Sequence, residues 1–105
     1  MSDTPDEGYD EIEAEYDAHR EALFELVSGY AEEHDLDDAL LTGLLLDLSV
    51  STRMLLYAYG TEKPSAGGLK LELDRFLKDV GDHVREVKKA AEDFIADIKA
   101  DRESN

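Results

Sequence analysis

Hydrophobic residues recur along most of the chain at the three- and four-residue spacing of an α-helix. No stretch rich in valine, isoleucine or threonine alternates apolar and polar residues, as a half-buried strand would. The pattern predicts three helices, over about residues 9–34, 37–59 and 66–100. We therefore expect an all-α fold, a three-helix, up-down-up antiparallel bundle with a long third helix.

The segments outside these helices are polar. Residues 1–8 form an acidic N-terminus that we predict to be disordered, residues 9–102 are predicted to form a single helical domain, and residues 103–105 are a tail. The stretch that follows the second helix contains one proline and several glycines, so we predict that residues 60–68 form a loop.

Single residues mark the helix boundaries. Asp35 and Asp37 are both suitable N-cap residues for the second helix, and Gly60 is suited to end it. Gly81 lies inside the third helix, where a glycine costs up to about 1 kcal/mol relative to alanine. We expect any kink of the third helix to lie there.

The second helix contains the most apolar stretch of the chain, residues 40–60. A membrane-spanning helix needs about 20 apolar residues with few charges. Asp47 and Arg53 interrupt this stretch near its middle, and each would cost about 2.5–3.5 kcal/mol at the centre of a bilayer. We therefore predict a buried helix and no membrane partner.

The apolar residues of the second helix surround most of its circumference. Only a narrow strip, formed by Thr42, Ser49 and Arg53, is polar. The helices on the surface of a small bundle usually have an apolar stripe somewhat over about 100° wide, and this one exceeds twice that width. Two neighbours in a three-helix monomer cannot cover it, which indicates a partner chain.

The predicted helix lengths also indicate a partner. At about 1.5 Å per residue, the third helix spans roughly 50 Å and the other two less than about 40 Å. Its excess length is apolar, so either the helix kinks at Gly81 or another subunit covers its end. We predict a homodimer, with an unidentified protein as the alternative partner. The predicted interface residues are Leu44, Leu48, Leu55, Tyr59, Phe94, Ile95 and Ile98.

The chain is strongly acidic, with 27 acidic and 11 basic residues and a formal net charge of −16. This charge excludes nucleic-acid binding by phosphate neutralisation, which needs clustered lysine and arginine. The chain has no cysteine, which excludes disulfides and thiol catalysis. Its N-terminus lacks the basic and apolar regions of a signal peptide, so we expect a cytoplasmic protein.

Two interpretations of the acidic surface compete. Abundant aspartate, sparse lysine and the absence of cysteine and tryptophan resemble the composition of proteins from salt-loving cells. In concentrated salt an acidic surface stays hydrated while its self-repulsion is screened. The alternative is that the carboxylates mimic DNA or dock a basic partner. We favour adaptation to high salt.

A metal site is the alternative chemical hypothesis. The pairs Glu15–His19 and Asp79–His83 have the i, i+4 spacing that places two side chains on one helix face. The second helix offers only Asp47 as an inward ligand, and the Glu-x-x-His motif of helical di-metal proteins is absent. The candidate ligands are Glu15, His19, Asp47 and His83. Since His19, His34 and His83 are expected at three different levels of the bundle, we expect no metal.

Asp47 is expected to form a structural ion pair with Arg75, Lys78 or Arg85 of the third helix, because an unpaired buried carboxylate is costly. No serine or threonine has a histidine and an acid at a spacing that suggests nucleophilic catalysis. We therefore expect no enzymatic activity and no cofactor. The sequence favours a non-enzymatic oligomerisation or protein-interaction module adapted to high salt, with a metal-binding protein or metal-dependent enzyme as the alternative.

Overall fold

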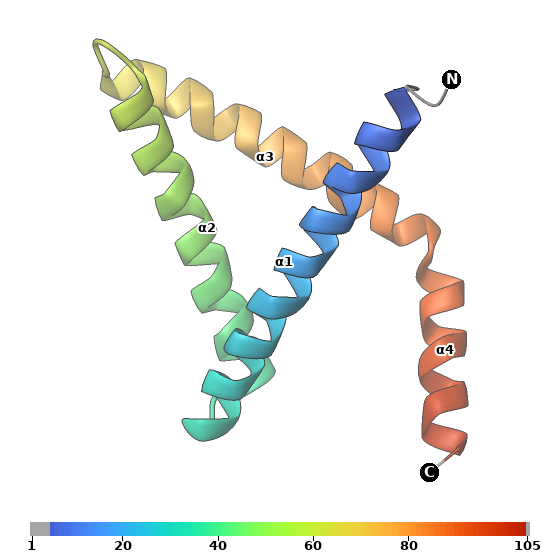
Figure 1. The fold of residues 1–105 in the computed structure, drawn as a ribbon. Helices are drawn as coiled ribbons and strands as arrows, with labels where there is room; N and C mark the ends of the chain where they lie inside the picture. Colours follow the sequence, from blue (N-terminus) through green and yellow to red (C-terminus); the bar gives the residue numbers. More distant parts are fainter. Residues whose placement is uncertain (1–4, 105) are drawn as a thin grey trace. The chain divides into compact units, whose positions relative to one another are not determined.

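The structure is a computed structural model that describes residues 5–104, with side chains from residue 10 onward. It contains, in this order, the helices α1 (Pro5–Glu33), α2 (Asp38–Gly60), α3 (Ala66–Lys89) and α4 (Ala91–Glu103) (Figure 1). The described residues include no strand, which confirms the all-α prediction. Part of the predicted disordered N-terminus, residues 1–4, lies outside the described residues, as does Asn105 of the tail.

The single third helix predicted over residues 66–100 is instead two helices, so the three-helix prediction is not confirmed. The break falls at Ala90 (φ −99°, ψ 11°), whose N–H bonds to the carbonyl oxygen of Val87, three residues back, at 3.0 Å. Gly81, where we expected a kink, lies inside the continuous helix α3.

Charges on either side of Ala90 explain why the helix ends there. Lys88 and Lys89 occupy the last turn of α3, and Glu92 and Asp93 occupy the first turn of α4. Cations stabilise the C-terminus of a helix and anions stabilise the N-terminus. The order of these four charges therefore favours two helix ends over one continuous helix.

The corner between α1 and α2 closes with hydrogen bonds that are typical of a Schellman motif. The N–H of Leu36 donates to the carbonyl oxygen of Ala31 at 2.9 Å, and the N–H of Asp35 donates to the carbonyl oxygen of Glu32 at 3.3 Å. Asp35 has a φ of 54°, the left-handed conformation that this motif requires. Asp37, one of the two expected N-cap residues, accepts the N–H of Leu40 at 2.8 Å and thereby starts α2.

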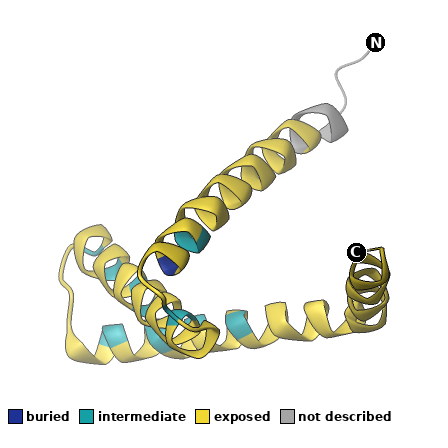
Figure 2. Ribbon diagram, turned by 90° about the horizontal axis from the view of Figure 1, so that it is seen from below, coloured by how far each residue is buried: buried dark blue, intermediate teal, exposed yellow. Residues whose placement is uncertain are grey.

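The chain divides into two units, Met1–Leu45 and Leu46–Asn105, and the boundary between them falls within α2. Exposed residues dominate every helix (Figure 2), and Ala31, at the α1–α2 corner, is the one buried hydrophobic residue among the described side chains. Within each unit, the described residues therefore form no large hydrophobic core. The bundle is not confirmed, and the homodimer stays a prediction.

Candidate interaction surface

Two side chains on one side of α2, Arg53 and Tyr57, contact the start and the first half of α3. This inner side consists of Val50, Arg53 and Tyr57, which are half-buried. The half-buried residues of α3 are Gly68, Leu69, Glu72, Leu73, Phe76 and Val80. Their spacing of three and four residues is that of one helix face.

Arg53 provides the main polar contact between the two helices. Its Nη2 lies 3.1 Å from Oε1 of Glu72, and its guanidinium lies 5.8 Å from the centroid of the Phe76 ring. Both distances fit an ion pair and a cation–π contact. Arg53 belongs to the narrow polar strip of this helix, and the structure places it against α3.

Tyr57 forms a hydrogen bond at the corner between α2 and α3. Its hydroxyl accepts the N–H of Ser65 at 3.2 Å, and the Ser65 side chain accepts the N–H of Gly68 at 3.0 Å, which caps α3. A Cβ atom at Gly68 would collide with the Tyr57 hydroxyl. Glycine at position 68 therefore leaves room for the Tyr57 hydroxyl at this corner.

An open hollow of about 360 Å³ lies beside this corner. Its lining comes from α2, the following loop and the start of α3, and it includes Met54, Ala58, Pro64 and Leu69. No carboxylate, histidine or lysine lines it. The hollow therefore offers apolar contact and no acid–base or metal chemistry.

The opposite side of α2 is apolar and exposed. At about 100° per residue, the four predicted interface residues of α2 lie on the side opposite to Val50, Arg53 and Tyr57. We call these residues the outer face: Leu44, Leu48, Leu55 and Tyr59. Leu48 is 63% exposed and Tyr59 is 86% exposed. Between residues 44 and 59 no charged side chain lies on this face.

The predicted interface residues of the C-terminal segment lie on α4. Phe94, Ile95 and Ile98 are all exposed large hydrophobic residues. Val84 and Val87 continue the apolar stripe of α3 toward them and are exposed as well. The structure therefore leaves every predicted interface residue accessible, and it does not test whether they meet a partner.

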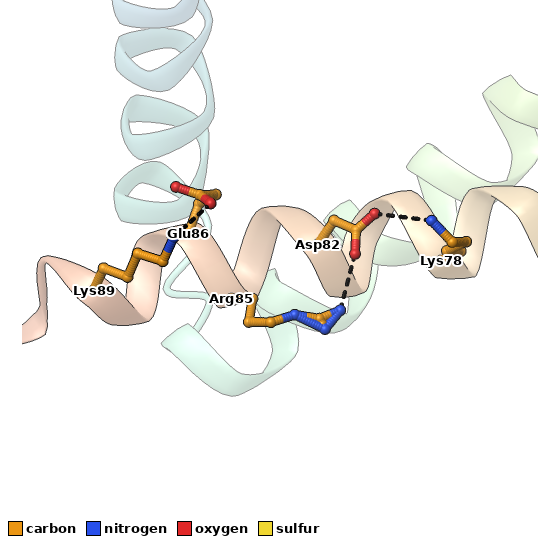
Figure 3. Close-up of polar contacts among 5 residues, drawn as sticks. All are labelled: Lys78, Asp82, Arg85, Glu86 and Lys89. Carbon is orange, nitrogen blue, oxygen red and sulfur yellow. Dashed lines mark hydrogen bonds and ion pairs between the residues drawn. The ribbon is translucent and has the colours of Figure 1, made fainter.

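The polar side of α3 is neutralised by ion pairs along the helix (Figure 3). Asp82 binds both Lys78, at 3.3 Å, and Arg85, at 2.9 Å, and Glu86 binds Lys89 at 2.9 Å. In α1 the carboxylates from Asp10 onward form no ion pair within the described chain. The unbalanced negative charge of the protein is therefore concentrated in its N-terminal segment, where residues 1–35 contain 13 acidic residues and one basic residue.

The candidate metal ligands are divided between three helices and between the two units. Glu15 and His19 lie on α1, Asp47 lies on α2 and His83 lies on α3. Among the described residues, no group of three or more histidine, aspartate or glutamate side chains could hold a metal ion. The hollow at the α1–α2 corner, about 650 Å³ in volume, is acidic, but Asp37 is engaged there as the cap of α2.

Asp47 does not form the ion pair that we expected. Its side chain is exposed and has no hydrogen bond or ion pair within residues 10–104. Two of its expected partners, Lys78 and Arg85, bind Asp82 of their own helix. Exposure explains the difference, because an exposed carboxylate is solvated by water and needs no partner.

Sequence reasoning could have found the contact between Arg53 and Glu72. The two residues are nearly equidistant in sequence from the middle of the loop, so they lie at the same level of an α2–α3 hairpin. A long basic and a long acidic side chain at one level are the expected pair. The order of charges around Ala90 was likewise present in the sequence.

By length and composition, α2 is long and apolar enough to cross a membrane. One such helix is weak evidence, because the core helix of a soluble protein passes the same test. Asp47 and Arg53 remain in its middle, and Arg53 is bound to Glu72 of the amphipathic helix α3. The absence of a membrane partner stays a prediction.

No protein-family model, curated protein or solved structure matches this chain. Its function must therefore be argued from its own residues.

Proposed function

We propose that this protein is a non-enzymatic oligomerisation or protein-interaction module adapted to a salt-rich cytoplasm, and that it acts as a homodimer. The observation that carries the proposal is the outer face of α2. This face is apolar, uncharged and exposed, while the opposite side of the same helix contacts α3. A helix that is apolar all round is normally buried all round.

Burial of this surface contributes free energy to association. A fully buried leucine contributes about 1.5–3 kcal/mol relative to an exposed one. Full burial of the three leucines on each of two copies would contribute roughly 9–18 kcal/mol, which is comparable to the cost of association, about 4–15 kcal/mol. Phe94, Ile95 and Ile98 of α4 are proposed to extend the interface.

The charge distribution supports function at high salt. Two copies carry a formal net charge of −16 each and repel one another in dilute buffer. Molar salt reduces the screening length to about 3 Å, which removes this repulsion and leaves the apolar contact. Both association and thermal stability are therefore expected to rise with the salt concentration.

The test is the molar mass by light scattering at micromolar protein concentration, in dilute buffer and in molar KCl. In molar KCl we expect twice the chain mass of 11.7 kDa, with a higher melting temperature than in dilute buffer. Leu44→Glu and Phe94→Glu should each give a monomer or an unfolded chain, whereas the control Glu11→Lys should not. A stable 11.7 kDa monomer in molar KCl would contradict the dimer, and a melting temperature that is flat or falling would contradict the adaptation to salt.

The metal alternative is tested on the same preparation. Protein purified without an affinity tag should contain no stoichiometric transition metal. A bound metal that Asp47→Asn or His83→Ala removes would overturn the non-enzymatic assignment in favour of a metal-binding protein.

A further inference from the structure

The outer face of α2 has a symmetric sequence pattern. Its four large residues, Leu44, Leu48, Leu55 and Tyr59, are separated by four, seven and four positions. This spacing is the same in both directions along the chain. Its centre falls between Ser51 and Thr52, two small residues that are also exposed.

Such a pattern matches an isologous contact between two copies of one helix. A two-fold axis perpendicular to a helix generates an antiparallel partner, in which each position faces its mirror position about the centre. Leu48 of one copy then lies beside Leu55 of the other, and Leu44 beside Tyr59. The small side chains at the centre allow the helix axes to approach to the usual distance of about 8–10 Å.

The charges of α2 favour a second copy over a basic partner. A basic partner would bind where carboxylates gather, and the outer face contains none between residues 44 and 59. Asp47 lies on the flank of the helix, and Arg53 is held by Glu72 on the inner side. The outer faces of two copies can therefore meet without placing charged side chains against each other.

We infer that α2 pairs with α2 of a second copy as an antiparallel helix dimer whose two-fold axis passes between Ser51 and Thr52. The inference rests on the proposed self-association and specifies its geometry. Each α2 is then packed between α3 of its own chain and α2 of the other copy. This arrangement explains why the helix is apolar on opposite sides.

Single cysteines test this geometry, because the chain contains none of its own. Ser51→Cys is next to the proposed axis, so the thiols of two copies lie side by side. Ala58→Cys is the matched control: it lies seven residues further on the same side of the helix and is also exposed. In the antiparallel dimer its two copies are 13 residues apart along the axis, or roughly 20 Å. Neither change removes a large apolar side chain.

Each full-length variant is oxidised mildly in molar KCl, and the covalent dimer is measured by non-reducing electrophoresis. We expect Ser51→Cys to form at least about ten times more disulfide-linked dimer than Ala58→Cys, because cysteines whose Cα atoms are more than about 7 Å apart cannot be bridged. Equal cross-linking of both variants would indicate parallel helices, and cross-linking of neither or of Ala58→Cys alone would place the contact elsewhere. Either result would overturn this geometry.

The molar mass of the reduced variants separates this inference from the proposed function. A reduced dimer with the wrong cross-linking pattern overturns the antiparallel register and leaves self-association intact. A reduced monomer, formed for example because α1 of the same chain covers the outer face, overturns both.

Discussion

The two sides of α2 differ in how their residues are held. On the inner side, Arg53 and Tyr57 make directed polar contacts to Glu72 and Ser65, and these contacts fix the level at which α2 and α3 meet. On the outer face there is more apolar surface and no polar contact at all. Apolar residues indicate that a helix face is buried, but they do not specify what buries it. Polar residues do specify the neighbouring element, because they need matching partners. A polar group leaves water at a high cost unless it finds a partner, so its contacts are specific.

Truncating one leucine on each side gives the sharpest comparison and the largest expected effect. Leu48→Ala removes outer-face contacts from both copies of the dimer, at about 2 kcal/mol per copy, and should raise the dissociation constant roughly a thousandfold. Leu46→Ala is the matched control, since Leu46 is also exposed but lies toward the inner side. Sedimentation equilibrium in molar KCl measures both. Similar dissociation constants for the two variants would show that the outer face contributes no more to dimerisation than the inner side.

Two neighbouring glycines test the inner side. Gly68→Ala places a Cβ against the Tyr57 hydroxyl and should lower the free energy of unfolding by about 1–2 kcal/mol. Gly67→Ala meets no atom within 4 Å, so it should instead raise that free energy by up to about 1 kcal/mol through helix propensity. Urea denaturation followed by circular dichroism measures both. A stabilising effect of Gly68→Ala would mean that Tyr57 is not held at the corner.

The smallest expected effect is that of the ion pair on the inner side. Arg53→Ala should cost about 1 kcal/mol, because it removes a half-buried contact to Glu72 and the contact to Phe76. The buried Nε of Arg53 has no hydrogen-bond partner in the described structure. Because the substitution also removes this unsatisfied group, the loss of stability stays small. Lys78→Ala, which breaks an exposed pair on α3, should cost less than about 0.5 kcal/mol in the same denaturation experiment. Equal losses would show that burial adds nothing to the Arg53 pair.

The sequence predicted which parts of the chain are helical because apolar periodicity is a local property. The predicted all-α class and the cap at Asp37 follow from such local signals. The break at Ala90 was missed because no glycine or proline marks it. The break depends on charged residues at the helix ends, and each of these changes the stability of a helix by only about 0.3–1 kcal/mol.

The candidate site was less predictable from sequence. The helical wheel of α2 could not distinguish the side that contacts α3 from the outer face, because leucines occupy both. The ion pair between Arg53 and Glu72, which are 19 positions apart, determines which side of α2 faces α3. Asp47 was assigned an ion pair because it was assumed to be buried, and its exposure removes the reason for that pair.

That 19-residue separation also bears on how fast the protein folds. No hydrogen bond or ion pair that joins α2 to α3 or to its N-cap spans a longer stretch of sequence. Contacts of such low contact order form within microseconds to milliseconds. Burial of the outer face, in contrast, requires an encounter between two copies, so its rate depends on protein concentration. Dilution will therefore slow the assembly of the proposed dimer without slowing the formation of its helices.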